Sequence, residues 1–388
     1  MDRALADLIR ISNVTGRDST LVQGGGGNTS VKTADGKYMY IKASGTALKD
    51  MSEKQGWRRL RLDAVLSVID DQALAELDAD KREPEVVNRL LLACDDDVTV
   101  AARPSVESHL HAFLDRCVIH LHPLVVAAYV NARNGRAQIA KLFKNEELPP
   151  LWVPYTDPGF LLAKRISRLV QTYQKQYGRK PAVMLLEKHG LFVTAGTPDA
   201  ALRLVRNVIE LCSSTLKAPK VRKAKPPVES EIAAAKAAIG TAVLEATGQS
   251  LPVTHYPNNE SVTAFMARKD AAKLLATPAL NPDELVYANG SAMWLEKCDV
   301  RTITRKLKSR VSKGQKPAAA FIIKGRGLFV AADEKTAPLI AEITAGSLLI
   351  RMYAAKFGGI LALSRRQQSF INNWESEAFR KKLAGEKK

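Results

Sequence analysis

Cysteine is scarce in this chain of 388 residues: four occur, and none forms a CxxC pair. A disulfide framework and a zinc site built from thiolates are therefore not expected. The chain also lacks any apolar run near the roughly 20 residues that a membrane helix needs. Its first residues lack the apolar core of a signal peptide. We therefore expect a cytoplasmic protein without a membrane partner.

Aromatic residues make up only 6% of the chain, and acidic residues are few in its second half. The net charge is +18, of which residues 1–215 carry +4 and residues 216–388 carry +14. A basic excess fits nucleic acid, an anionic surface or phosphorylated substrates as partners. With 46% hydrophobic and 25% charged residues the composition is that of an ordinary globular protein, and the length suggests two or three domains.

A lysine-rich stretch with three prolines, LKAPKVRKAKPPVESE, interrupts the chain at residues 216–231. Proline disfavours both a core helix and a central strand there, so we interpret it as an exposed linker. Before it, helical and extended patterns alternate, which predicts an α/β domain over residues 1–215 and a second α/β domain over residues 232–388. The clearest expected elements are strands at Tyr38–Lys42 and Cys117–Ile119 and helix starts near Val106, Gly159 and Pro198.

Two stretches of the chain resemble each other. Residues 181–193 read PAVMLLEKHGLFV and residues 317–330 read PAAAFIIKGRGLFV, with Gly325 as one extra residue in this alignment. The second domain is therefore either a degenerate duplicate of the first or a convergent strand-turn-strand unit, and both interpretations stay open. Because Arg326 stands where the first copy has His189, we expect no equivalent metal site in the second domain.

Five of the six histidines lie between residues 109 and 189. His120 and His122 stand two apart at the end of a strand-like run, where alternate side chains share a face. Two such imidazoles can bind one divalent cation at about 2.0–2.1 Å each, although a pair of buried, hydrogen-bonded histidines is the plainer interpretation of HxH alone. His189, in a tight turn before Gly190, is a candidate third ligand that leaves a coordination position open.

Glu107 lies in RPSVESHLH, in the first turn of a predicted helix, with His111 on the same face. An acid in a first turn ordinarily complements the helix dipole. Beside a metal, the same carboxylate is a candidate general base for taking a proton from the carbon next to a carbonyl.

The segment QGGGGNTSVK, residues 23–32, contains four consecutive glycines. Such a run indicates positive φ angles or close approach of backbone to a ligand, and a flexible surface loop is the alternative. Asn28 beside exposed amides, together with the ASGT turn at residues 43–46, would suit a phosphate or another oxyanion. The run is no Walker A loop, and because GxGxxG is absent from the chain we expect no redox activity.

The motifs GGNTSVK, IKASGT, PSVE, HLHP, PYTDPGFLLA and KHGLFV, in this order, resemble those of the class II aldolase/adducin family. The likeness spans most of residues 1–215. It is closest to the aldolase half of bacterial bifunctional rhamnulose-phosphate aldolase/dehydrogenase proteins. The resemblance implies a metal-dependent catalytic domain with a central β-sheet flanked by helices. It matches His120, His122 and His189 to the zinc ligands and Glu107 to the catalytic acid/base.

The resemblance also implies the reaction, which is reversible cleavage of a ketose 1-phosphate into dihydroxyacetone phosphate and an aldehyde. Zn²⁺ or another divalent metal would stabilise the enediolate. Val106 replaces a second serine that is common in the family, and Tyr155 lies in a matching segment without an assigned role. The resemblance further implies a homo-oligomer. The positions matched to the substrate phosphate are Asn28, Ser44, Gly45 and Ser105.

Three other functions stay open. An epimerase or decarboxylase would share the enediolate chemistry, and adducin-like relatives are non-catalytic binding proteins. The third is nucleic-acid binding, because RTITRKLKSRVSKGQK at residues 301–316 has seven basic residues and no acid. That run lacks aromatics for base stacking and any nucleic-acid motif, so a solvated basic face is the preferred interpretation.

Overall fold

The structure is a computed structural model that describes residues 2–96, 102–217, 226–257 and 259–374. Contacts within the chain divide it into two compact units. Of the residues that the structure describes, unit 1 comprises those within 2–130, 136–215 and 369–374, and unit 2 comprises those within 131–135 and 216–368. Among the described residues, no helix has the length and apolar character needed to cross a membrane.

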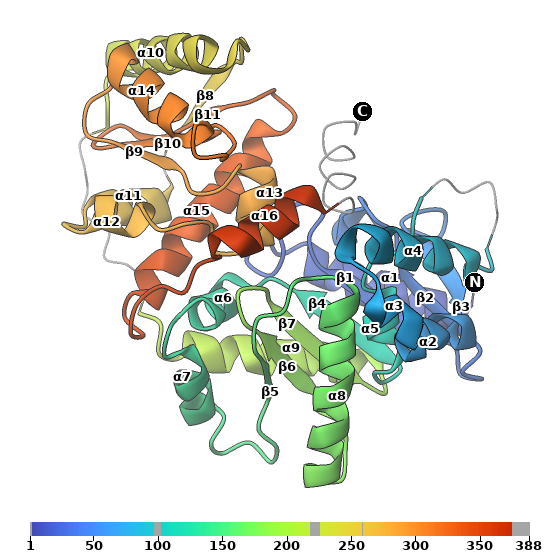
Figure 1. Ribbon diagram of the computed structural model, residues 1–388. Helices are drawn as coiled ribbons and strands as arrows, with labels where there is room; N and C mark the ends of the chain where they lie inside the picture. Colours follow the sequence, from blue (N-terminus) through green and yellow to red (C-terminus); the bar gives the residue numbers. More distant parts are fainter. Residues whose placement is uncertain (1, 97–101, 218–225, 258, 375–388) are drawn as a thin grey trace. The chain divides into compact units, whose positions relative to one another are not determined.

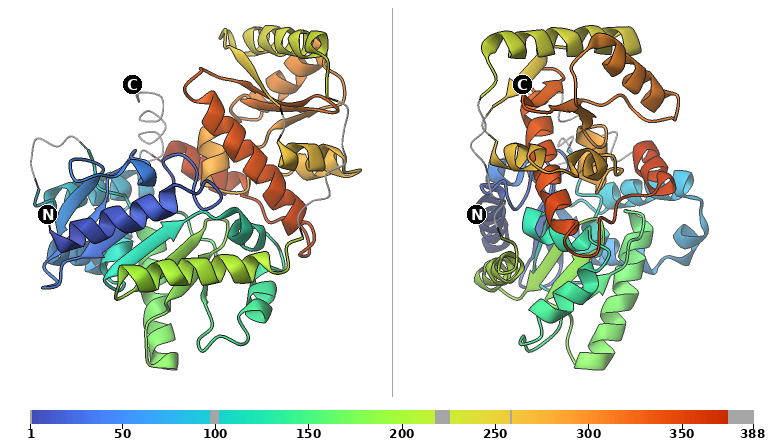
Figure 2. Two further views of the ribbon diagram at one scale, coloured as in Figure 1. Left: turned by 180° about the vertical axis from the view of Figure 1, so that it is seen from behind. Right: turned by 90° about the vertical axis from the view of Figure 1, so that its left-hand side faces the viewer.

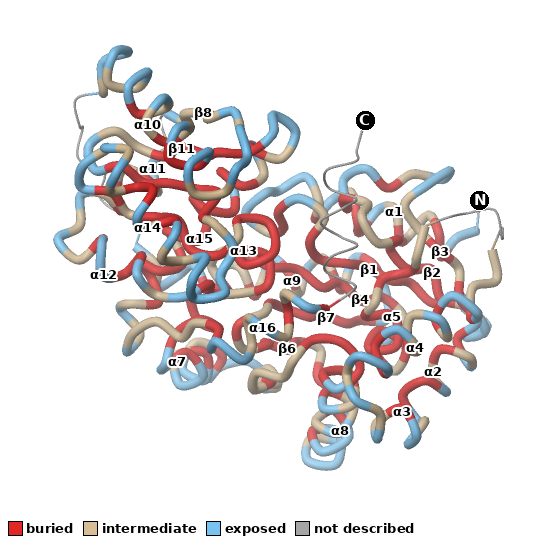
Figure 3. Tube along the Cα trace, turned by 45° about the horizontal axis from the view of Figure 1, so that its top comes forward, coloured by how far each residue is buried: buried red, intermediate tan, exposed pale blue. Residues whose placement is uncertain are grey.

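Unit 1 is built on a seven-stranded sheet with the order β3-β2-β1-β4-β7-β6-β5. All neighbouring strands are antiparallel except β5 and β6, which are parallel. Every residue of β1, β4 and β7 is buried, as the red tube in Figure 3 shows. The strands are β1 (Asn28–Lys32), β2 (Tyr38–Lys42), β3 (Trp57–Arg61), β4 (Cys117–Leu121), β5 (Leu151–Val153), β6 (Val183–Leu186) and β7 (Leu191–Ala195).

Helices cover both faces of this sheet, which confirms the predicted α/β class (Figure 1). On one face, α1 (Arg3–Gly16) and α9 (Pro198–Ser213) contact each other and run side by side, as the left view of Figure 2 shows. On the other face, α2 (Leu62–Asp70), α5 (Ser108–Ala112) and α8 (Phe160–Tyr177) enclose an apolar core with the sheet. The remaining elements of this part are η1 (Leu48–Asp50), α3 (Gln72–Glu76), α4 (Ala79–Leu92), α6 (Leu124–Val130) and α7 (Gly135–Leu142).

The start of α8 depends on a glycine. Gly159 has a φ of 101°, and a Cβ atom there would lie 2.2 Å from Glu83 Oε2. That carboxylate accepts a hydrogen bond of 3.2 Å from the backbone N–H of Phe160, the first residue of α8. It therefore satisfies one of the unpaired N–H groups of the helix start and complements the helix dipole. At the other end, Gly178 closes α8 in the left-handed conformation.

We expect Gly159→Ala to lower the free energy of unfolding by more than the ~1–3 kcal/mol of a strained backbone alone, because the new methyl group also meets Glu83. Gly178→Ala is the matched control, since its φ is also positive but an added Cβ has nothing within 4 Å. Urea denaturation compares the two variants. Equal losses would show that the Glu83 contact is unimportant.

Unit 2 is built on a four-stranded sheet with the order β8-β11-β10-β9. One face packs against α10 (Glu229–Thr247) and α14 (Val300–Val311), which lie together in Figure 1. The other face packs against α11 (Glu260–Met266) and α15 (Ala337–Ala354). The expected second α/β domain is confirmed. The other elements are β8 (Val253–Tyr256), β9 (Met293–Leu295), β10 (Ala320–Ile323), β11 (Gly327–Ala331), α12 (Ala271–Leu275) and α13 (Pro282–Tyr287). The last helix, α16 (Arg365–Asn373), belongs to both units, because the boundary between them falls after residue 368.

The sheet of unit 2 repeats the order β4-β7-β6-β5 of unit 1. In both, the first two neighbouring pairs are antiparallel and the last pair is parallel. The register repeats as well, because His120 lies opposite Phe192 on β7 and His255 lies opposite Phe329 on β11. Shared order, direction and register favour duplication over convergence.

The turns of the two hairpins also correspond. His189 N donates to Leu186 O at 3.1 Å, and Arg326 N donates to Ile323 O at 2.9 Å. Arg326 therefore takes the place of His189, and Gly325 takes the place of Lys188. The sequence alignment that treated Gly325 as an extra residue was wrong, because the extra residue lies before β10 rather than in the turn.

The predicted linker at residues 216–231 is described only in part. Residues 218–225 lie outside the described residues, so the structure does not address the interpretation there. Residues 229–231 form the first turn of α10 rather than a linker. The Glu231 carboxylate accepts a hydrogen bond of 3.3 Å from Val228 N, which stabilises a helix start directly after the prolines.

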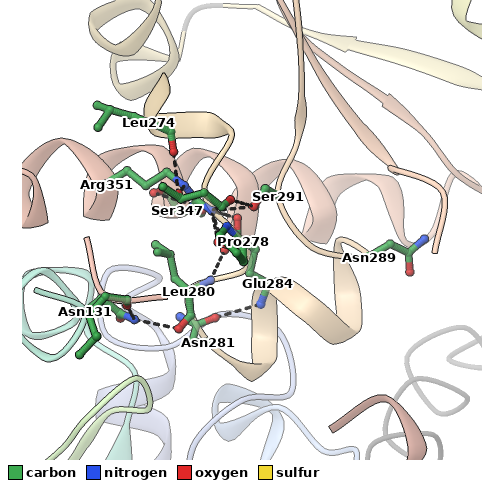
Figure 4. Close-up of polar contacts among 12 residues, drawn as sticks. Asn131, Leu274, Pro278, Leu280, Asn281, Glu284, Asn289, Ser291, Ser347 and Arg351 are labelled. Carbon is green, nitrogen blue, oxygen red and sulfur yellow. Dashed lines mark hydrogen bonds and ion pairs between the residues drawn. The ribbon is translucent and has the colours of Figure 1, made fainter. Parts of the chain in front are cut away.

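A buried ion pair holds α13 and α15 together in unit 2. Arg351 is fully buried, and its guanidinium donates to Glu284 Oε1 at 2.8 Å. Burying two charges is costly unless each is fully hydrogen-bonded. Both charges have further partners here: Arg351 also donates to the Pro278 carbonyl and the Ser291 hydroxyl, and Glu284 accepts from Leu280 N (Figure 4).

Arg351→Met should lower the free energy of unfolding by about 3–5 kcal/mol, because it leaves Glu284 buried without its counter-charge. Arg268→Met is the control in the same unit, since its ion pair with Asp270 is partly exposed and should contribute about 1 kcal/mol or less. Denaturant titration of both variants tests this. Similar small losses would contradict the importance of the buried pair.

The basic run at residues 301–316 divides into two groups. Arg301, Arg305 and Lys308 are exposed and share one face of α14. Arg310 instead donates to three backbone carbonyls, those of Asn289 at 2.8 Å, Ser291 at 2.9 Å and Lys316 at 3.4 Å. Part of the run is therefore structural rather than a free binding surface.

Candidate metal centre

Antiparallel pairing gathers distant sequence motifs at one edge of the unit 1 sheet. β1 begins at Asn28, which pairs with His120 near the end of β4. β2 ends at Lys42, directly before the ASGT turn. β7 begins at Leu191, so the turn that carries His189 lies at the same edge.

Three histidine nitrogens converge at this edge. His120 Nε2 lies 3.1 Å from His122 Nε2 and 3.3 Å from His189 Nε2. Around a tetrahedral ion with bonds of about 2.0–2.1 Å, ligand nitrogens are about 3.4 Å apart. The structure thus brings the three residues of the predicted ligand set into a spacing that fits a divalent cation.

The protonation of His120 also suits a metal ligand. Its Nδ1 lies 3.0 Å from the carbonyl oxygen of Leu191. A carbonyl can only accept, so Nδ1 carries the proton and Nε2 keeps its lone pair. Burial lowers the pKa of His120 well below its ordinary value, so the ring is neutral at neutral pH.

Phe192 supports the same ring from the neighbouring strand. The two ring centroids are 4.0 Å apart with an interplanar angle of 16°. Stacking and the Leu191 carbonyl together restrict how His120 can rotate. The sequence reasoning missed this residue, although it lies in the GLFV motif, because only the β4–β7 register places it against the histidine.

Glu107 lies directly beside the histidines, at the N-cap position of α5. Glu107 Oε2 lies 3.6 Å from His120 Nε2, and Glu107 Oε1 lies 3.8 Å from His189 Nε2. Burial tends to raise the pKa of Glu107 and is the largest single influence. His120 and His189, when their rings carry a proton, and the hydrogen bond from the Asn28 amide act in the opposite direction and lower this pKa below its ordinary value.

Asn28 orients this carboxylate. Its Nδ2 donates to Glu107 Oε2 at 2.6 Å. Its Oδ1 is buried and accepts no hydrogen bond within the described part of the chain. A buried acceptor without a partner is costly, so a donor group of a ligand would stabilise it.

The other residues predicted to bind phosphate lie on two paired segments. Ser44 N donates to Arg103 O at 2.8 Å, and Ser105 N donates to Lys42 O at 3.0 Å. Gly45 follows with a φ of 80°. Ser44, Gly45 and Ser105 are therefore brought together, with the Ser105 hydroxyl accepting from Glu107 N at 3.3 Å.

The glycine run joins this group through a lysine that the sequence reasoning missed. Lys42 is buried, and its ammonium donates to Gly25 O at 2.8 Å. Gly27 has a φ of 61°, and a Cβ there would lie 2.7 Å from His120 O. Both positive φ and close approach to β4 therefore require glycine at this position.

Two histidines close in sequence do not join the cluster. His111 Nδ1 lies 2.8 Å from the Ser30 hydroxyl, and His109 stacks on Phe160 with centroids 6.2 Å apart. Burial lowers the pKa of His109 to about 4 and that of His111 to about 3. Both are neutral core residues at neutral pH.

Comparison with known proteins places the chain in a family. The model of the "Class II Aldolase and Adducin N-terminal domain" matches residues 6–216, more than half of the chain. The protein belongs to this family, as its motifs predicted. Members of the superfamily are generally lyases, and its aldolases typically use a divalent metal.

Individual relatives are more distant. The "Uncharacterized oxidoreductase YuxG" of Bacillus subtilis is 26% identical over 331 residues, which cover 80% of this chain and 45% of that protein. The chain thus spans less than half the length of this curated relative.

Solved structures resemble part of the chain. The N-terminal class II aldolase domain of a conserved protein from Thermoplasma acidophilum is 27% identical, with a TM-score of 0.46, over 56% of this chain and 95% of that one. L-fuculose 1-phosphate aldolase from Glaciozyma antarctica is 11% identical, with a TM-score of 0.37, over 59% of this chain and 78% of that one.

We expect His120→Ala and His189→Ala to abolish stoichiometric binding of a divalent metal, because each removes one of the three candidate ligands. His255→Ala is the control, since His255 occupies the same register position in unit 2. Metal analysis after dialysis, and the visible spectrum of the Co²⁺-loaded protein, measure binding. Retention of one equivalent by His189→Ala, or loss by His255→Ala, would refute this assignment.

Proposed function

We propose that the protein is a metal-dependent class II aldolase, a carbon–carbon lyase that cleaves a ketose 1-phosphate into dihydroxyacetone phosphate and an aldehyde. The observation that carries this proposal is the convergence of His120, His122 and His189 on one point with the Glu107 carboxylate beside it. Membership of the aldolase and adducin family supports the reaction class.

The three histidines would hold the metal, with Zn²⁺ as the first candidate. When bound, a divalent cation supplies a Lewis acid for the carbonyl and hydroxyl oxygens of the substrate. Because His120 is held by the Leu191 carbonyl and by Phe192, its nitrogen is oriented before any ligand arrives.

Glu107 would move the proton. In the condensation direction its carboxylate takes a proton from the carbon next to the carbonyl of dihydroxyacetone phosphate, and in cleavage it returns that proton. Its low pKa means that it begins as the base. The Asn28 amide holds one carboxylate oxygen and so orients Glu107 toward the reacting carbon.

The substrate phosphate would lie among Asn28, Ser44, Gly45 and Ser105. Backbone amides of the glycine run and the small hydroxyls offer neutral donors, and the buried Lys42 ammonium adds positive charge close to Gly25.

A cytoplasmic location, a homo-oligomeric state and a closest link to rhamnulose-phosphate aldolase/dehydrogenase proteins stay predictions. An epimerase or decarboxylase would use the same metal and base, and product analysis distinguishes these reactions.

The test is incubation of the Zn²⁺-loaded protein with dihydroxyacetone phosphate and a panel of short aldehydes. Proton NMR in D₂O follows both the new carbon–carbon bond and the exchange of the carbon-bound proton. We expect Glu107→Gln to slow both by about 10²- to 10⁴-fold, with its metal content unchanged.

Glu147→Gln is the control, because its carboxylate is exposed and pairs with the exposed Arg179. Absence of exchange and of condensation with every aldehyde would exclude the proposed reaction. Full activity of Glu107→Gln would exclude Glu107 as the base.

A further inference from the structure

The turn between β6 and β7 contains a lysine in an unfavourable backbone conformation. Lys188 has a φ of 56°, in the left-handed region where glycine is favoured. The corresponding residue of unit 2 is Gly325, with a φ of 75°. The same turn is thus made with glycine in the unit that lacks the histidine cluster, so turn formation alone does not explain Lys188.

Lys188 is held at the edge of the sheet that carries the histidines. Only 7% of its surface is exposed, and its backbone N–H donates to Val130 O at 2.9 Å. The next residue in the chain is the metal-ligand candidate His189. A lysine that is buried here loses side-chain entropy and hydration, so the charge is kept at this position at a cost in free energy.

An aromatic residue accompanies the lysine. The Lys188 ammonium lies 5.0 Å from the centroid of the Tyr155 ring. Tyr155 follows β5, and Glu187 N donates to Val153 O at 3.0 Å, which ties the turn to the end of β5. The ends of the parallel strands β5 and β6 thus form one group that contains a cation and a phenol.

This group lies on the other side of the histidines from the residues proposed to bind phosphate. In the sheet, β2 and β6 are separated by β1, β4 and β7. At about 4.8 Å per strand, the strand axes are roughly 19 Å apart. One phosphate cannot be shared by Ser44 after β2 and Lys188 after β6, so Lys188 would meet a different part of the substrate.

We propose that Lys188 determines substrate specificity by recognising an anionic group, a carboxylate or a phosphate, on the aldehyde portion of the substrate. This inference rests on the aldolase function proposed above and extends it to the class of aldehyde. Lys188 precedes His189 in the same turn, so its charge would add to the positive potential around a cation held by the histidines, and an anionic aldehyde would be attracted by both charges. The Tyr155 ring contacts the lysine at this end of the sheet.

The test compares matched anionic and neutral aldehydes in condensation with dihydroxyacetone phosphate. The anionic members are glyceraldehyde 3-phosphate and glyoxylate, and the neutral members are glyceraldehyde and glycolaldehyde. We expect the unaltered protein to prefer the anionic member of each pair in kcat/KM. In Lys188→Gly this preference should fall about 10- to 100-fold, the worth of a hydrogen bond to a charged group, and Lys188→Arg should restore part of it.

Stability separates recognition from folding. Lys188→Gly relieves the left-handed strain and should keep or raise the melting temperature. The reciprocal variant Gly325→Lys places the strain in unit 2 and should lower the melting temperature without changing the aldehyde preference.

Calorimetric titration with glyoxylate gives a readout that does not need turnover, and Lys188→Gly should bind it at least about 10-fold more weakly. The inference is overturned if neutral aldehydes are preferred, if Lys188→Gly keeps the anionic preference, or if both proteins bind glyoxylate equally. If neutral aldehydes still condense, these outcomes overturn the role of Lys188 and leave the aldolase proposal intact. The aldolase proposal itself fails only if no aldehyde condenses.

Discussion

The pairing of β4 with β1 and β7 is the constraint on which the rest of unit 1 depends. It sets Asn28 on one side of His120 and Phe192 on the other. A slip of one residue would turn His120 to the opposite face of the sheet and move the Leu191 carbonyl away from its ring. Because every residue of β4 is buried, such a slip would also place apolar side chains at the polar site and histidine side chains in the apolar core. Hydrophobic burial therefore enforces the geometry of the polar site.

The sequence was sufficient to predict residue types and local elements, and it could not supply the register. The HLHP and KHGLFV motifs predicted three histidines that the structure brings together, and the Pro158–Gly159 and Pro198 signals predicted the starts of α8 and α9. Phe192, Lys42 and the Ser30–His111 hydrogen bond were not predicted, because each depends on residues that meet only through tertiary folding. The wrong placement of Gly325 in the sequence alignment has the same origin. Similar residues in two segments can be aligned in several ways, whereas the hydrogen bonds of the two turns allow one alignment.

Unit 2 shows that this scaffold does not need the histidine cluster. It keeps the strand order, the hairpin and a histidine opposite a phenylalanine, with ring centroids 4.6 Å apart. The counterparts of His122 and His189 are Pro257 and Arg326, so the ligand set is lost while the backbone arrangement remains. The strands are held by their own hydrogen bonds and by the apolar core rather than by a metal. By analogy, the site of unit 1 is preorganised, unlike a zinc finger, whose fold forms only with its ion.

The hydrogen bond from His120 Nδ1 to the Leu191 carbonyl has a consequence for mutational drift. Many metal sites orient a histidine with a neighbouring carboxylate side chain, which a single codon change can remove. A main-chain carbonyl is present whatever side chain residue 191 carries. The tautomer of His120 is thus protected from most point mutations at its partner. Random mutagenesis would find the candidate ligands and the candidate base but would overlook the group that sets the proton on His120.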